Sequence, residues 1–130
     1  MVKKLTCAAF IISALVSCSD KTPEEFTLSS QRVRIDPDYT NLTIPYNMAP
    51  LNFTIHEEAD AYLTRIYSEK GRSIDIQGKD VLINEDPWMK LLSENRGDTI
   101  FFQIRLRTGE SWIQYPPIAN TIATEPIDRL

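Results

Sequence analysis

The sequence predicts an all-β fold, an immunoglobulin-like β-sandwich with one short helix near residues 87–96, after an N-terminal signal peptide. Three observations support this prediction. Six or seven segments of alternating apolar and polar residues recur at spacings of about 8 to 15 residues, with turn-forming residues between them. One segment changes to helical periodicity. An apolar run follows two lysines at the N-terminus.

The N-terminus has the layout of a secretory signal, with an apolar run over residues 5–16 and small residues after it. The run of about 12 residues is shorter than the roughly 20 that a membrane-spanning helix needs. Residues 15–18, Leu-Val-Ser-Cys, resemble the bacterial lipobox, in which the cysteine becomes the lipidated first residue. We expect a lipoprotein signal peptide over 1–17 and lipidation of Cys18, which anchors the chain to a membrane. An ordinary signal peptide and an uncleaved anchor are the alternatives.

Removal of the signal makes the chain more acidic. Loss of two of the 14 basic side chains leaves 12 against 18 acidic ones, a net charge of −6. This balance disfavours nucleic acid as a partner, because nucleic acid rewards basic patches. Cys7 leaves with the signal and Cys18 is lipidated, so we expect no disulfide within the chain.

Residues 18–30 are polar with little periodicity and predict a flexible tether, followed by a β-sandwich domain over 31–125 and a linker remnant over 126–130. The turn-forming sequence Asp-Pro-Asp-Tyr-Thr-Asn at 36–41 interrupts the first strands. Alternation predicts these strands, in order, near residues 32–35, 42–44, 51–56 and 62–70.

The segment IPYNMAPLNFTI, residues 44–55, has a proline-rich half and an alternating half. Pro45 and Pro50 cannot donate backbone hydrogen bonds, so they predict a rigid crossover or an edge strand. Met48 is expected to pack down on the core. In the alternating half, we expect buried side chains at Leu51, Phe53 and Ile55, and an exposed His56.

Two further pairs of strands are predicted after this segment. Residues 74–76 and 81–83 should form a hairpin around a turn at 78–80. Residues 99–108 and 111–115 should pair around the turn at Gly109 and Glu110. The inward side chains of the longer strand should be Ile100, Phe102, Ile104 and Leu106.

Between these pairs the sequence predicts a short helix. Asp86 is the expected N-cap, Pro87 the first helical residue and Gly97 the stop. An apolar stripe of Trp88, Leu91 and Leu92 should dock the helix on a sheet.

Few residues carry candidate chemistry. Trp112 and Tyr115 could form an aromatic platform for a glycan or a protein, although aromatic residues on strands more often pack in the core. His56 with Glu57, Glu58 and Asp60 could hold a metal ion, but their spacing fits no zinc or calcium pattern, so we expect a solvated turn and no metal. With no nucleophile–base pair visible, we expect no enzymatic activity and no cofactor.

The order of motifs resembles the opening domain of a family of Bacteroidetes lipoproteins. The resemblance lies in "IDPDYTNLTIPYNMAPLNFTI", "PWMKLL" and "IATEPIDRL", and it covers about residues 34–130. Met48 stands where the family typically has Ile, and Tyr46 stands where it often has Pro. The resemblance implies a following WD-like or Tol-type β-propeller; the family is often labelled cytochrome c biogenesis-like. This sequence has no C-x-x-C-H motif, so no haem role is carried over.

We therefore expect a non-catalytic, lipid-anchored domain of the cell envelope, facing the periplasm or the cell exterior. Its expected role is to space or dock a partner, such as a C-terminal propeller that this sequence lacks. The abrupt end in a linker-like segment favours a truncated reading frame over a stand-alone domain. The alternative is a module that binds a glycan or an envelope protein through Trp112 and Tyr115.

Overall fold

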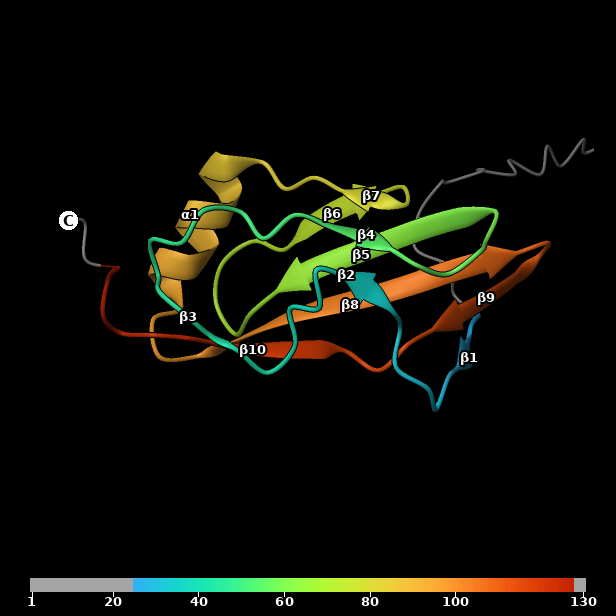
Figure 1. The fold of residues 1–130 in the computed structure, drawn as a ribbon, viewed down its shortest axis with the longest axis horizontal. Coiled ribbons are helices and arrows are strands. Elements are labelled where there is room, and N and C mark those ends of the chain that lie inside the picture. Colours follow the sequence, from blue (N-terminus) through green and yellow to red (C-terminus); the bar gives the residue numbers. More distant parts are fainter. Residues whose placement is uncertain (1–24, 128–130) are drawn as a thin grey trace, which may run out of the picture.

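The computed structural model describes residues 25–127, which form two β-sheets and a helix (Figure 1). The predicted signal peptide at 1–17 and the predicted lipidation site Cys18 lie outside these residues. The all-β fold class is confirmed, because ten strands make up most of the regular structure and α1 (Glu85–Glu94) is the one helix of the described part. Within the same part, no helix is long and apolar enough to cross a membrane.

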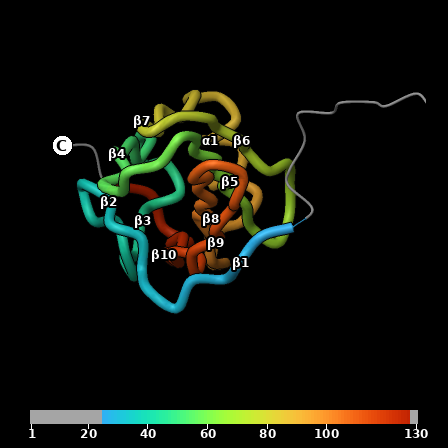
Figure 2. The backbone as a smooth tube through the Cα atoms, turned by 90° about the vertical axis from the view of Figure 1, so that its right-hand side faces the viewer, coloured from blue at the N-terminus to red at the C-terminus, as the bar shows by residue number. Residues whose placement is uncertain are grey.

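The strands form a larger and a smaller sheet. The larger sheet contains β1 (Thr27–Leu28), β3 (Thr43–Ile44), β5 (Ala61–Tyr67), β6 (Ile74–Gln77), β8 (Thr99–Thr108), β9 (Ser111–Gln114) and β10 (Ile118–Ile122). The smaller sheet contains β2 (Ile35–Asp36), β4 (Phe53–Ile55) and β7 (Asp80–Val81), with β4 in the centre. Seen end-on in Figure 2, β4 and β7 lie above β8, β9 and β10, and buried side chains from both sheets form one core.

Strand β8 is the centre of the larger sheet. It pairs antiparallel with β5 along one edge and with β9 and β10 along the other. The alternation predicted for β8 is confirmed, since its inward side chains are all buried: Ile100, Phe102, Ile104 and Leu106. The ring of Phe102 lies 5.6 Å from that of Phe53 in the smaller sheet, so β8 connects the two layers.

Strands β9 and β10 form one return path along β8 that is interrupted by Pro116 and Pro117. Gln114 pairs with Arg105, whereas Ile118 pairs with Phe102. Four residue steps on the return path therefore oppose three on β8, which defines a one-residue β-bulge. The bulge shifts the inward phase of the return path, and Ile118 and Ile122 are buried as a result. Strand β10 was not predicted, because Pro116 and Pro117 hide its alternation.

The predicted hairpin over 74–83 is wrong. β6 pairs with β5 in the larger sheet, whereas β7 pairs with β4 in the smaller one. The chain changes sheets at Gly78, whose backbone φ of 108° is a value that glycine adopts readily and other residues rarely do. The N–H of Gly78 donates to the Tyr62 carbonyl at 3.0 Å. The next carbonyl, that of Lys79, accepts from the N–H of Ile55 at 2.9 Å. In the sequence, two short apolar runs around a turn are compatible with a hairpin and equally with a chain that passes from one sheet to the other.

The predicted helix is present but begins two residues earlier than expected. Its N-cap is Asn84, so Asp86 lies in the first turn, where a carboxylate interacts favourably with the helix dipole. Pro87 is tolerated there because the N–H groups of a first turn have no partner within the helix. The predicted stripe is confirmed, since the buried helical side chains are Trp88, Leu91 and Leu92. The helix ends at Glu94 with Asn95 as its C-cap, and Gly97 follows two residues later with a φ of 85°.

The proline-rich half of residues 44–55 packs against the helix. Met48 lies half-buried on the core, and its carbonyl accepts a hydrogen bond of 2.9 Å from the indole of Trp88. The guanidinium of Arg96 lies 3.7 Å from the centre of the Tyr46 ring, a second contact with the end of the helix. The predictions for the alternating half are confirmed: Leu51, Phe53 and Ile55 are buried and His56 is exposed.

The described end of the predicted tether is partly ordered into the larger sheet. Thr27–Leu28 form β1, which pairs in parallel with β9. Two residues are too few for an alternating pattern to be visible in the sequence, so the strand was not predicted. It brings Phe26 and Leu28 to one edge of the larger sheet.

Candidate binding site on the larger sheet

The outer face of the larger sheet, which points away from the core, gathers arginine and aromatic side chains. On β5 and β8, Tyr67 pairs with Phe101 and Arg65 with Gln103, while their neighbours Ile66 and Phe102 are buried. Because side chains alternate along a strand, the four side chains next to these buried ones point outward: Arg65, Tyr67, Phe101 and Gln103. We define the outer face by Leu63, Arg65, Tyr67, Phe101, Gln103, Arg105, Arg107, Trp112 and Gln114.

Aromatic rings lie at both ends of this face. Tyr67 and Phe101 are stacked, with centroids 5.2 Å apart and an interplanar angle of 23°. At the other end, the Arg105 guanidinium lies 4.6 Å from the centre of the Phe26 ring. Leu28, which pairs with Gln114, is 70% exposed. The face therefore offers apolar surface to a partner around its arginines.

The charge of the outer face is positive. Arg65 donates two hydrogen bonds to Asp75 of β6, at 2.7 and 3.2 Å, and so is neutralised. Arg105 donates to the amide oxygen of Gln114 at 2.7 Å and forms no salt bridge within residues 25–127. Desolvation and the charge of Arg65 lower the pKa of Arg105, which stays protonated. The Nε atom of Arg107 is buried without an acceptor in the described residues.

A shallow hollow of about 330 Å³ opens on this face beside the Tyr67–Phe101 stack. Its lining consists of Arg65, Tyr67, Ser68, Gly71, Ser73 and Gln103. These residues supply guanidinium, amide and hydroxyl groups and one aromatic ring, but no carboxylate or imidazole that could act as a base. The hollow is therefore suited to binding rather than to acid–base catalysis.

The loop between β5 and β6, residues 68–73, forms one wall of the hollow and is held by buried Asn95. The side-chain oxygen of Asn95 accepts from the Lys70 N–H at 2.9 Å, and its amide donates to the Lys70 and Leu91 carbonyls, both at 2.8 Å. The hydroxyl of Ser68 donates to the Thr99 carbonyl at 2.7 Å. These contacts fix the loop to α1 and β8.

The structure does not bring the two predicted binding residues together. Trp112 pairs with Arg107 and lies on the outer face, where it is half-buried. Tyr115 lies three residues further on and packs against the core on the opposite face. Desolvation raises the pKa of its hydroxyl. The two rings therefore form no common platform.

The acidic cluster near His56 is spread over separate partners. Glu57 pairs with Arg34, Glu58 with Lys79 at 3.4 Å, and Asp60 accepts from the Gly109 N–H at 2.7 Å. His56 itself lies 3.7 Å from Asp36. Within residues 25–127, no three metal-ligating side chains lie close enough to share an ion.

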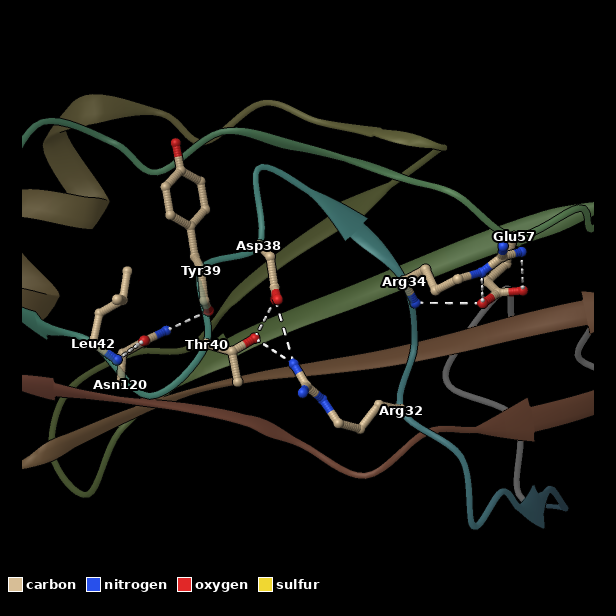
Figure 3. Close-up of polar contacts among 8 residues, drawn as sticks. All are labelled: Arg32, Arg34, Asp38, Tyr39, Thr40, Leu42, Glu57 and Asn120. Carbon is tan, nitrogen blue, oxygen red and sulfur yellow. Dashed lines mark hydrogen bonds and ion pairs between the residues drawn. The ribbon is translucent and has the colours of Figure 1, made fainter.

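A second set of polar contacts holds the turn at 36–41 to the sandwich, as Figure 3 shows. The Arg32 guanidinium donates to Thr40 at 2.9 Å and to Asp38 at 3.4 Å. Buried Asn120 accepts from the Leu42 N–H at 2.8 Å and donates to the Tyr39 carbonyl at 3.0 Å. Every contact here satisfies a turn or a backbone group, so the set is structural.

Glu57 forms an ion pair with Arg34 in the same region. Both its carboxylate oxygens accept from Arg34, at 3.1 and 3.4 Å (Figure 3). The hydrogen bond from the Arg34 side chain lowers the pKa of Glu57, against a smaller opposing effect of burial. The pair fastens β2 to the turn after β4.

Sequence reasoning missed most of the outer face. The outward phase of 99–108 was visible, and it already placed Phe101, Arg105 and Arg107 together. Their partners Arg65 and Tyr67 lie on another strand, β5. The register between β5 and β8 cannot be predicted from the sequence of either strand alone. A search for strands whose outward positions combine arginine and aromatic residues would have selected both.

Comparison of the chain with protein-family models, with curated proteins and with solved structures finds no match.

Proposed function

We propose that this chain is a non-catalytic, lipid-anchored domain of the bacterial cell envelope that docks an envelope component through the outer face of its larger sheet. Cys18 carries the lipid, and the domain faces the periplasm or the cell exterior. The signal-like N-terminus and the lipobox-like residues 15–18 support the anchor. The outer face supports the docking role.

The observation that carries the docking role is the combination of aromatic side chains with arginines that have no carboxylate partner in the described residues. Arginine and aromatic residues are enriched in the binding surfaces of proteins. Arg105 and Arg107 are the cations in question, and Trp112 lies beside them. A cation that has already lost part of its hydration gains more from an anionic partner than a fully hydrated one does.

The anchor is tested by cell fractionation. The Cys18→Ala variant of the full chain should leave the membrane fraction after signal removal, while the wild type stays there. Acyl chains contribute about 0.8 kcal/mol per buried CH₂, so a lipidated chain should not be released by salt washing. A Cys18→Ala variant that has lost its signal and still fractionates with membranes would contradict the anchor.

The docking face is tested with isolated cell envelopes from cells that lack the chain. Full chain that carries Cys18→Ala, and so has no lipid to insert, should bind these envelopes, and the same chain with the further changes Trp112→Ala and Arg107→Gln should not. Lys90→Gln is the control, because it removes one positive charge from the exposed side of the helix, away from the outer face. Equal retention of the double variant and the control would contradict docking through this face.

We also propose that the sandwich is immunoglobulin-like in its strand order. The pairing of β5 with β6 and β8, and of β8 with β9, corresponds to a C′-C-F-G order in one sheet. The order β2-β4-β7 corresponds to A-B-E in the other. The helix α1 then lies in the connection between strands E and F.

A second candidate role is to space a following β-propeller from the membrane, as the resemblance of residues 44–53 to the Bacteroidetes lipoprotein family implies. One contact favours it. The side-chain oxygen of Asn47 accepts from the Ile127 N–H at 2.7 Å, so this segment directs the chain at the end of the described residues. The nucleotide sequence downstream tests the candidate: an in-frame or shifted propeller supports it, and unrelated sequence contradicts it.

A further inference from the structure

We propose that the domain rests directly on the membrane that holds its own lipid, through a patch of the outer face beside β1. This membrane patch consists of Phe26, Leu28, Arg105, Arg107 and Trp112. The inference rests on the proposed function, since it takes the anchor at Cys18 as given. It names the surface of the lipid bilayer as the envelope component that the outer face docks.

The membrane patch is assembled from three neighbouring strands. Leu28 of β1 pairs with Gln114 of β9, and Gln114 pairs with Arg105 of β8. Residues directly opposite each other in a sheet share a face, so these three side chains form one row on the outer face. The guanidinium of Arg105 lies 4.6 Å from the centre of the Phe26 ring, which brings that ring to the same row.

The chemistry of the patch fits the headgroup region of a bilayer. Leu28 is 70% exposed and Phe26 is 38% exposed, so both offer apolar surface to a neighbour. Trp112 pairs with Arg107 in the next row of the same face. An indole suits the boundary between lipid and water because it is apolar and also carries one N–H donor. A guanidinium presents paired donors to a phosphate.

Charge separates this face from the rest of the chain. The outer face contains Arg65, Arg105 and Arg107 and no acidic residue. The chain without its signal carries 18 acidic side chains against 12 basic ones. Glu25 and Glu110 are the carboxylates closest to the patch in sequence, and within residues 25–127 neither pairs with a patch arginine. Headgroup phosphates therefore attract this face and repel the acidic surface elsewhere.

The short segment between the lipid and the domain selects the bilayer as the occupant of the patch. Eight residue steps separate Cys18 from Phe26, and at roughly 3.3–3.6 Å per step they reach at most about 29 Å. A domain of about 100 residues, with a radius of gyration of about 13 Å, is about 34 Å across. The lipid is therefore held closer to the patch than the width of the domain.

The sheet fixes the point from which this segment leaves. The N–H of Ser29 donates to the Gln114 carbonyl at 2.9 Å, next to the pairing of β1 with β9. Figure 1 shows β1 and β9 at one end of the larger sheet and α1 at the other. The bilayer is thus a surface held permanently beside the patch at high effective concentration, whereas a glycan or a protein would have to displace it.

Quenching of Trp112 by brominated phospholipids tests the proposal. The probe is the lipidated chain after signal removal, reconstituted in vesicles of phosphatidylcholine and phosphatidylglycerol with brominated acyl chains. Bromine quenches tryptophan only at short range. The chain has two tryptophans, and the other one, Trp88, is 0% exposed. We expect brominated vesicles to quench the wild type more than unbrominated ones do, and Trp112→Phe to lose this difference.

Two leucines of nearly equal exposure assign the contact to the patch. Leu28→Ser should lower the ratio of docked to undocked domain, and with it the quenching, at least about tenfold, the factor expected for loss of one buried leucine side chain. Leu82→Ser is the matched control, because Leu82 is 68% exposed but follows β7 of the smaller sheet. Arg105→Gln should also lower the quenching, whereas Lys90→Gln on the helix should not. Circular dichroism confirms that each variant is folded.

Flotation of the same vesicles separates the anchor from the patch. A chain that floats with the vesicles but shows no bromine-dependent quenching overturns this inference and leaves the anchor intact. A chain that does not float removes both. Equal quenching of Leu28→Ser and Leu82→Ser, or of Arg105→Gln and Lys90→Gln, also overturns the inference.

The envelope-retention experiment is scored separately. Retention of the Cys18→Ala chain by envelopes, without quenching of the lipidated chain in protein-free vesicles, means that the outer face docks an envelope protein or a glycan. That result overturns the membrane contact and leaves the docking role in place.

Discussion

Replacement of Asn95 by alanine should destabilise the domain more than any change of similar size on its surface. The Asn95 side chain is 1% exposed and makes three hydrogen bonds, to the Lys70 N–H, the Lys70 carbonyl and the Leu91 carbonyl. Each such bond contributes about 1 kcal/mol net, and the Leu91 carbonyl has little access to water once its partner is gone. The expected loss is therefore about 3 kcal/mol.

That loss is a large part of the roughly 5–15 kcal/mol by which domains of this size are stable. At roughly 4–8 °C per kcal/mol, the Tm of the full chain should fall by roughly 12–24 °C. Circular dichroism during thermal unfolding measures the fall. Hydrogen exchange of the Lys70 amide should accelerate even under conditions in which the variant stays folded, because the loop of residues 68–73 is released from α1.

Two variants control this experiment. Ser93→Ala removes an exposed hydroxyl of the same helix, which donates to the Lys90 carbonyl, and should cost less than about 0.5 kcal/mol. Asn95→Asp keeps the acceptor for Lys70 but turns the two amide donors into an oxygen that faces two carbonyls, so it should be at least as harmful as alanine at neutral pH. A Tm for Asn95→Ala equal to that of Ser93→Ala would refute the reasoning, and so would a wild-type Tm for Asn95→Asp.

Three more predictions concern the core and one ion pair. Thr64→Val should raise the stability by about 1 kcal/mol, because the buried hydroxyl has no partner in the described residues; a lower Tm would show that it has one. Trp88→Phe should cost about 1–3 kcal/mol, because it leaves the Met48 carbonyl unpaired, and urea unfolding measures this. The lowered pKa of Glu57 means that its pair with Arg34 stabilises the fold above its ordinary pKa of 4.5 and that this contribution disappears as the pH falls through the lowered value. Arg34→Gln should raise that pKa in an NMR titration, and an unchanged titration curve would contradict the assignment.

Local patterns predicted the buried faces well. The alternation of β8 and the stripe of α1 each repeat several times, and repetition makes the period visible. His56 was placed outside for the same reason, since three neighbours fixed the phase of its strand. A short element such as β1, with two residues, has no period to detect.

Pairing between distant segments could not be predicted in the same way. Whether β7 returns to β6 or crosses to β4 depends on which buried surface Val81 can reach, and that surface is built by strands from elsewhere in the chain. The outer face depends on the register of Tyr67 with Phe101, 34 residues apart. By contrast, the placement of Trp112 and Tyr115 on opposite faces could have been predicted from the sequence, because residues three apart on a strand point to opposite faces.

The bulge at Pro116 and Pro117 also has a consequence for how copies of this chain meet. One edge of the larger sheet, the one opposite β6, is covered by two short strands, β1 beside β9 and β3 beside β10, and the prolines lie between them with no N–H to offer. A neighbouring chain that approached this edge would find no unbroken row of donors to extend. Lipid anchoring would crowd copies of this chain on a membrane. Resistance to aggregation at this edge would matter most under such crowding.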